Sequence, residues 1–290
     1  MVRNNALGLP NLGLGVGLRH AHFSAILENG PQIDFFEIIS ENFLDHHGYA
    51  RHVLERLRGS VPMVMHGVSL SIGSADPLNW NYLHALRDLA GWLKPAWISD
   101  HLCWTGYAGI NSHDLLPLPY TPEVLAHVAD RIKAVQDFLG RPLILENPSS
   151  YLAFGASTLP EWAFLNALVT QTDCGLLLDI NNIYVSAFNL GFDPEVYLRE
   201  IALDHVVQIH LAGPSHNGDH LVDTHDHPVP PRVWALYRWV TARTGPVSTL
   251  LEWDASIPEY ADLLAEIRKA NPVGAPGFPE PMSLCMEGGV

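Results

Sequence analysis

The stretch PLILEN (142–147) is a short apolar run that ends in a carboxylate, and GLLLDI (175–180) repeats that arrangement after a segment with helical spacing (158–171). Both runs are apolar at successive positions, so both faces of each expected strand are covered. Strands of this kind, joined by a helix, are typical of parallel sheets. The stretch 142–180 therefore predicts a strand–helix–strand unit.

The same alternation extends over most of the chain. The other strand-like runs are 12–19, 34–40, 62–67, 96–101, 205–211 and 248–253, and the other helical segments are 21–29, 49–58, 77–93, 121–139, 193–203, 231–243 and 258–269. Eight strands alternating with eight helices predict an α/β fold, a single (β/α)8 TIM barrel, with an open doubly wound sheet as the alternative. We expect residues 1–270 to form this domain and the Pro/Gly-rich residues 271–290 to form a tail outside it.

Composition narrows the possible functions. The 290 residues are 48% hydrophobic and carry a formal net charge of −15, which disfavours binding to nucleic acid. The 3 cysteines are too few and scattered for a disulfide framework or a thiolate zinc site, whereas the 16 histidines equal the Lys and Arg count and favour metal binding. No apolar run is long enough to cross a membrane and no signal peptide is evident, so we expect a soluble cytoplasmic protein.

Metal-binding side chains stand at the ends of six consecutive strand-like runs. These residues are His66, His101, Glu146, Asp179, His210 and Glu252, and the segment DTHDH (223–227) adds Asp223 and His225. Strand ends meet on one face of a barrel, which is where barrel active sites lie. Eight ligands exceed the needs of one ion, so we expect two or three ions. Imidazole with carboxylate suits Fe, Mn or Zn and is typical of non-heme iron.

Polar residues flank the same strand ends. We expect Glu41, Asn147 and Asn182 to orient the ligands at the cofactor site, although a structural role for Glu41 is an equal alternative. The segment 101–120 is expected to form a wall or lid over the substrate.

Ten motifs together resemble the multinuclear non-heme iron-dependent oxidative enzymes, the family of the methanobactin-biosynthesis oxidase. In chain order they are GVGLR, SEN, HGVSLSIGS, SDHL, LLPLPYT, LENPSSY, LLDINNIYVSA, IHLAG, DTHDHPV and LEWD, within residues 12–265. The resemblance implies a barrel with two or three irons of mixed Fe(II)/Fe(III) state that uses O₂ as cosubstrate to modify cysteine residues of a ribosomally made precursor peptide. It also implies a small partner protein that presents the peptide.

Carried onto this sequence, the resemblance makes the same eight residues the metal ligands. Three of them, Asp179, His210 and Glu252, are also expected to be catalytic. Three alternatives stay open: a metal-dependent sugar isomerase, an endonuclease-type phosphodiesterase, and a metal-storage or scaffold protein. The lysines Lys94, Lys133 and Lys269 all lie in or beside expected helices, which weakens the isomerase, and the net charge weakens the phosphodiesterase.

Overall fold

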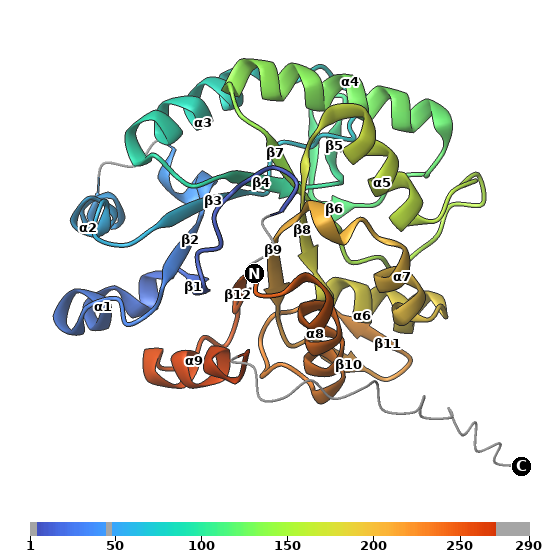
Figure 1. The fold of residues 1–290 in the computed structure, drawn as a ribbon. Helices are drawn as coiled ribbons and strands as arrows, with labels where there is room; N and C mark the ends of the chain where they lie inside the picture. Colours follow the sequence, from blue (N-terminus) through green and yellow to red (C-terminus); the bar gives the residue numbers. More distant parts are fainter. Residues whose placement is uncertain (1–4, 45–47, 271–290) are drawn as a thin grey trace, which may run out of the picture.

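Eight parallel strands close into a barrel in the computed structural model, which describes residues 5–44 and 48–270 (Figure 1). The strands are β1 (Leu14–Gly17), β2 (Phe35–Ile39), β3 (Met63–Gly67), β4 (Ile98–His101), β7 (Leu143–Glu146), β8 (Gly175–Asp179), β9 (Val206–Leu211) and β12 (Ser248–Leu251). Each lies within its predicted run, and β1 pairs with both β2 and β12, which closes the ring. The TIM barrel is confirmed and the open sheet is wrong.

All eight predicted helices are present around the barrel. They are α1 (Phe23–Asn29), α2 (Tyr49–Leu57), α3 (Trp80–Leu93), α4 (Pro122–Leu139), α5 (Glu161–Thr172), α7 (Pro194–Glu200), α8 (Pro231–Thr244) and α9 (Tyr260–Ile267), with short 3₁₀ turns at His20–His22, Ser40–Phe43, Leu203–His205 and Arg268–Ala270. Helix α4 begins where Thr121 accepts a hydrogen bond from Val124 N, as expected of an N-cap followed by proline.

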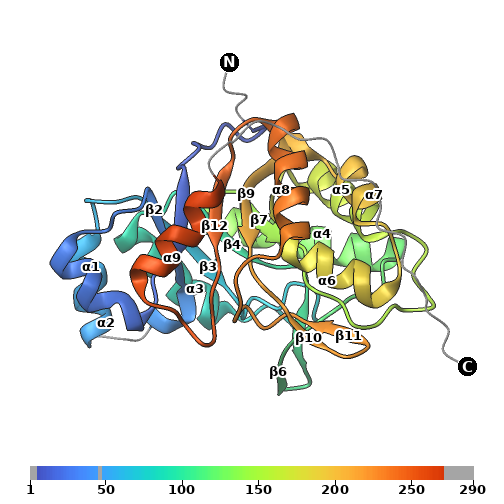
Figure 2. The same cartoon turned by 90° about the horizontal axis from the view of Figure 1, so that it is seen from below.

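One helix and two hairpins were not predicted from the sequence. Helix α6 (Ile180–Leu190) begins directly at the end of β8, because the Asp179 side chain caps it by accepting from Asn182 N. The hairpins β5–β6 (Trp104–Tyr107 and Ile110–Leu116) and β10–β11 (Ser215–Asn217 and His220–Val222) follow β4 and β9. Figure 2 shows both hairpins projecting from the same end of the barrel, so the segment 101–120 is a structured wall at that end.

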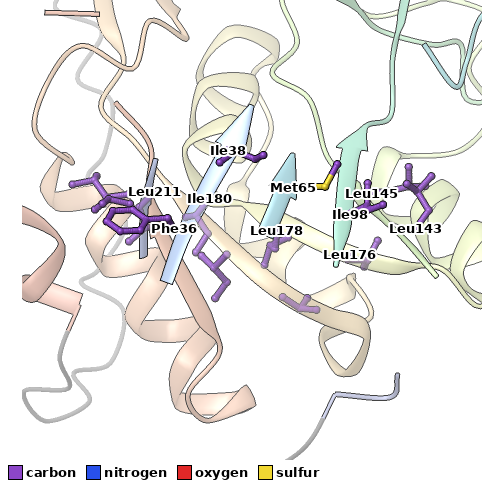
Figure 3. Close-up of a cluster of buried hydrophobic side chains, with 14 of the residues drawn as sticks. Phe36, Ile38, Met65, Ile98, Leu143, Leu145, Leu176, Leu178, Ile180 and Leu211 are labelled. Atoms are coloured by element: carbon purple, nitrogen blue, oxygen red, sulfur yellow. The ribbon is translucent and has the colours of Figure 1, made fainter. Parts of the chain in front are cut away.

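The core has an outer and an inner layer. Phe36, Ile38 and Met65 belong to the outer layer, where the sheet packs against the helices (Figure 3). Side chains alternate along a strand, so Phe35 and Val64 point to the barrel interior. There they form a separate apolar cluster with Trp97, Ile144, Leu177, Val207 and Leu250.

The inner face turns polar one step further along each strand. Two residues after Phe35, Val64, Ile144, Leu177 and Leu250 stand five buried polar side chains: Glu37, His66, Glu146, Asp179 and Glu252. Residues two apart share a face, so these side chains enter the barrel at its carboxyl end. The apolar cluster therefore forms a dry floor beneath a polar site.

Two sequence expectations concern the tail and the domain boundary. The tail predicted over 271–290 lies outside the described residues, and the domain boundary at 270 stays a prediction. Within residues 5–44 and 48–270, no helix has the length and hydrophobicity that crossing a bilayer requires.

Candidate metal centre

The first group of candidate ligands joins β3, β4 and β7. The Nε2 atoms of His66 and His101 lie 3.3 and 3.2 Å from the same oxygen, Oε2 of Glu146. The Nδ1 atom of His66 is 2.9 Å from Ser99 Oγ, and that of His101 is 3.3 Å from the Gly67 carbonyl oxygen. These contacts at Nδ1 leave each Nε2 directed at Glu146, so the three side chains converge on one point.

The second group centres on His210. Its Nδ1 atom lies 3.2 Å from Glu252 Oε2, 3.7 Å from Glu146 Oε1 and 4.0 Å from Asp179 Oδ2. Its Nε2 atom faces the barrel floor, 2.8 Å from Gln208 Nε2 and 3.1 Å from Glu37 Oε2. A metal at Nδ1 requires the ring proton on Nε2, where the Glu37 carboxylate can accept it.

A hydrogen-bond chain holds Glu37 in place beneath His210. Trp97 Nε1 donates to Gln208 Oε1 at 2.6 Å, and Gln208 Nε2 donates to Glu37 Oε2 at 2.6 Å. All three side chains are buried. The chain fixes which oxygen of Glu37 meets the imidazole.

The third group surrounds His225, which comes from the loop after β11. Its Nδ1 atom lies 3.1 Å from Asp254 Oδ2 and 3.3 Å from Glu252 Oε2, and its Nε2 atom lies 2.7 Å from Asp223 Oδ1. Asn181 Nδ2 donates to the same Asp223 oxygen at 2.7 Å. Asp223 and His225 are thus brought together as predicted, with Asp254 added.

Two carboxylates connect the three groups. Each group places one ligand atom per residue within 4.8 Å of the others: His66, His101 and Glu146; Glu146, Asp179, His210 and Glu252; His225, Glu252 and Asp254. Glu146 is shared by the first two groups and Glu252 by the last two. The two oxygens of Glu146 face different groups, and Oε2 of Glu252 faces both His210 and His225, so the arrangement suits a row of neighbouring ions.

The ligands are unsatisfied without a cation. Among the described residues, Glu146 Oε2, Asp179 Oδ2 and His210 Nδ1 are buried and make no hydrogen bond, although other ligand atoms lie 3.2 and 3.3 Å from Glu146 Oε2 and 3.2 Å from His210 Nδ1. A buried polar atom without a partner costs about 1–3 kcal/mol, more when charged, and ligation would remove that cost. The donor atoms of all three groups are imidazole nitrogens and carboxylate oxygens. The residues present fit a hard or borderline metal.

The pKa shifts of the buried groups also reflect an excess of negative charge at the centre. Burial, together with the Glu146 and Asp223 carboxylates, raises the pKa of Asp179 well above its usual value. Burial would lower the pKa of His210, but the carboxylates of Glu37, Glu146 and Glu252 raise it well above its usual value. Both shifts favour the proton-bearing form of these side chains, as expected of a centre rich in negative charge.

Two of the three predicted orienting residues contact the ligands. Asn147 holds the backbone of Asp179, accepting from its N and donating to its carbonyl at 2.9 Å each, and Asn182 Nδ2 lies 3.4 Å from Glu146 Oε1. Glu41 instead accepts from Val68 N and from the Tyr82 hydroxyl. This places Glu41 in the support of the segment after β3 rather than on a ligand.

Sequence reasoning missed Glu37, Asp254 and Arg19. Glu37 had a signal, since it is the single charged residue inside the apolar part of DFFEIIS. Asp254 lies two residues after Glu252, and side chains two apart in an extended segment point to the same side. Arg19 ends the GVGLR motif, and its Nη2 contacts carboxylate oxygens of both Asp254 and Glu252.

Comparison with solved structures shows the fold. D-psicose 3-epimerase from Clostridium cellulolyticum H10 superposes with a TM-score of 0.56 at 13% identity, covering 88% of this chain and 89% of the epimerase. The 3-keto-D-glucoside 4-epimerase from E. coli superposes with a TM-score of 0.56 at 15% identity, covering 89% of this chain and 99% of that epimerase.

Comparison of sequences shows the family. The UPF0276 protein Anae109_1558 of Anaeromyxobacter sp. (strain Fw109-5) is 53% identical over 91% of this chain and 93% of its own length. A UPF0276 protein of Caulobacter vibrioides (strain NA1000 / CB15N) is 52% identical over 92% of this chain and 96% of its own length. The family model for the RiPP precursor modification enzyme MbnB/TglH/ChrH, which acts on ribosomally made precursor peptides, matches residues 13–274. With its ligand groups at the carboxyl end of the barrel, this chain belongs to the MbnB/TglH/ChrH family of RiPP precursor modification enzymes.

Proposed function

We propose that this protein is a multinuclear non-heme iron oxidase that uses O₂ to modify cysteine residues of a ribosomally made precursor peptide. The observation that carries the proposal is the row of three ligand groups connected by Glu146 and Glu252. A row of neighbouring ions suits oxidation by more than one electron, and the family acts on precursor peptides.

Each group has its own ligands in this proposal. His66, His101 and Glu146 would hold one ion, and Asp179 and His210 would hold the next together with Glu146 and Glu252. His225 and Glu252 would hold a third on the side of His225 Nδ1, and Asp223, which the sequence also predicts as a ligand, lies 2.7 Å from the other ring nitrogen, Nε2. When bound, iron supplies one-electron chemistry with O₂ that no side chain offers.

The side chains of this chain prepare the site for that chemistry. Glu37 can accept a proton from His210 Nε2, and the apolar side chains of Phe35, Trp97 and Leu250 close the barrel beneath the ligands. Buried carboxylates hold the spacing of the groups. A thiolate is a good ligand for such ions, and binding lowers the pKa of a substrate thiol.

The substrate approaches the centre from one side. His101, Glu252 and His225 are 7–9% exposed, whereas His66, Glu146, Asp179 and His210 are at most 1% exposed. The hairpins β5–β6 and β10–β11 flank the same end of the barrel (Figure 2). We infer that the peptide enters between them, delivered by a small partner protein, in the reducing cytoplasm where its cysteines stay thiols.

The test begins with metal content and spectra. Protein purified without oxygen should contain two or three irons per chain and show a coupled mixed-valence signal by EPR and Mössbauer spectroscopy. A cysteine-containing peptide encoded beside the gene should then trigger O₂ consumption and a mass change. His210→Ala should lose both, while the control His52→Ala, on the exposed side of α2, keeps them.

Other outcomes would overturn the proposal. Zinc or manganese at full occupancy that iron cannot replace would move the function to hydrolysis or isomerisation. Bound iron without O₂ consumption by that peptide and its partner would leave a metal-storage protein.

A further inference from the structure

Asp254 stands at the third ligand group, although it lies beyond the end of β12. Its Oδ2 atom is 3.1 Å from His225 Nδ1, nearer than Glu252 Oε2 at 3.3 Å. Its backbone N also donates to the His225 carbonyl at 2.8 Å, which joins the loop after β12 to the loop after β11. A backbone hydrogen bond and a side-chain contact therefore both hold Asp254 beside His225.

Arg19 holds the outer oxygens of the two carboxylates. Its Nη2 atom is in contact with Asp254 Oδ1 and lies 3.6 Å from Glu252 Oε1, and its Nε donates to the Trp253 carbonyl at 3.4 Å. The other oxygens, Asp254 Oδ2 and Glu252 Oε2, face His225 Nδ1. One guanidinium thus turns one oxygen of each carboxylate toward the same imidazole nitrogen.

Exposure shows why Asp254 needs this contact. Its side chain is 38% exposed, so an unrestrained carboxylate would rotate into solvent, whereas the Arg19 side chain is 13% exposed. A planar guanidinium holds a carboxylate with defined geometry, which a flexible ammonium does less well. An exposed ion pair of this kind contributes little to stability by itself.

We propose that Asp254 is a further metal ligand, completing the third group, and that Arg19 is the residue that positions it. This inference rests on the metal centre proposed above. It adds one ligand to the set predicted from the sequence and gives a role to the cation at the end of β1.

The test is a metal titration of the full-length protein. Metal-free protein is titrated anaerobically with Fe(II), following heat by calorimetry and ions per chain by plasma mass spectrometry. Wild type should bind three ions, and Asp254→Asn should keep two while the third binds at least tenfold more weakly. Arg19→Gln should show the same selective loss, and Arg19→Lys should restore part of it. Arg199→Gln, which removes an exposed ion pair with Glu195 on α7, is the matched control.

A double variant separates positioning from a merely structural effect. Because Arg19 acts through Asp254 and Glu252, the loss of third-ion affinity in Arg19→Gln combined with Asp254→Asn should be smaller than the sum of the two single losses. Additive losses would overturn the positioning role. So would tighter binding of the third ion by Arg19→Gln, since Arg19 would then be a competing cation. If Arg19→Gln fails to fold, Arg19→Lys and Asp254→Asn carry the test.

The failure of this inference is distinguishable from that of the proposed function. Unchanged third-ion binding in Asp254→Asn, or a wild type that takes up two irons only, overturns the inference and leaves the oxidase standing. A wild type that binds no iron overturns both.

Discussion

Replacing Glu37 by Gln tests whether the barrel floor controls the metal centre. The variant keeps the shape of the side chain and removes the charge 3.1 Å from His210 Nε2. It also disturbs the chain below, because Gln208 already donates to Glu37 Oε2 at 2.6 Å and the new amide group must still present an oxygen both to Gln208 and to the imidazole. We expect weaker ion binding at the second group with little change in fold.

The size of the effect follows from the distance across the imidazole. An ion bound at Nδ1 lies about 7 Å from the Glu37 carboxylate, and a divalent ion at that distance gains about 5 kcal/mol at an effective dielectric of 20. Dehydration of the buried carboxylate offsets part of this gain. Partners of metal-bound imidazoles typically contribute 10–100-fold in metal affinity, and we expect that range, or about 1.4–2.7 kcal/mol.

The assay is a competition titration of metal-free Glu37→Gln against a chelator, with thermal unfolding of the metal-free protein in parallel. Glu266→Gln is the matched control, because Glu266 is also buried but pairs with Lys269 in the helical segment after β12. Equal metal affinity in wild type and Glu37→Gln would refute the reasoning. A loss of metal affinity shared by Glu266→Gln would refute it as well.

Three further predictions concern other parts of the same architecture. Metal loading at pH 7 should release protons, because the carboxylates around His210 and His225 raise both imidazole pKa values and a protonated ring must lose a proton to bind metal. The release is measured with a pH indicator in weak buffer, and loading without it would contradict the prediction. His210→Ala should abolish turnover and keep the circular dichroism of the wild type, and a fully active variant would remove His210 from the mechanism. Gly15→Ala should lower the free energy of unfolding by about 1–3 kcal/mol in a denaturant titration, because the added methyl would lie 2.4 Å from the Phe35 ring; Gly155→Ala, with open space around it, should change it little.

The sequence predicted the barrel because eight runs that are apolar on both faces alternate with eight segments of helical spacing. Hydrophobic periodicity thereby placed His66, Glu146 and Asp179 correctly at strand ends. It did not predict α6, because the DINN segment continues an apolar strand and only the side-chain hydrogen bond of Asp179 shows that a helix begins there. Nor could spacing alone assign Asp254, since its contact with His225 joins two loops.

The motif GVGLR shows how one strand can serve the site without supplying a ligand. At Gly15 the absent side chain leaves room for the Phe35 ring, which fills the floor of the barrel. At Gly17 an added Cβ would lie 3.1 Å from the guanidinium carbon of Arg19, so the second glycine admits the cation that contacts Glu252 and Asp254. Strand β1 therefore has glycine at two positions that matter for the site. Gly15 leaves room for the Phe35 ring in the apolar floor, and Gly17 leaves room for Arg19, whose positive charge offsets the repulsion between Glu252 and Asp254. Gly17→Ala should accordingly displace Arg19 and weaken the third group selectively, an effect that a metal titration would separate from the loss of stability expected for Gly15→Ala.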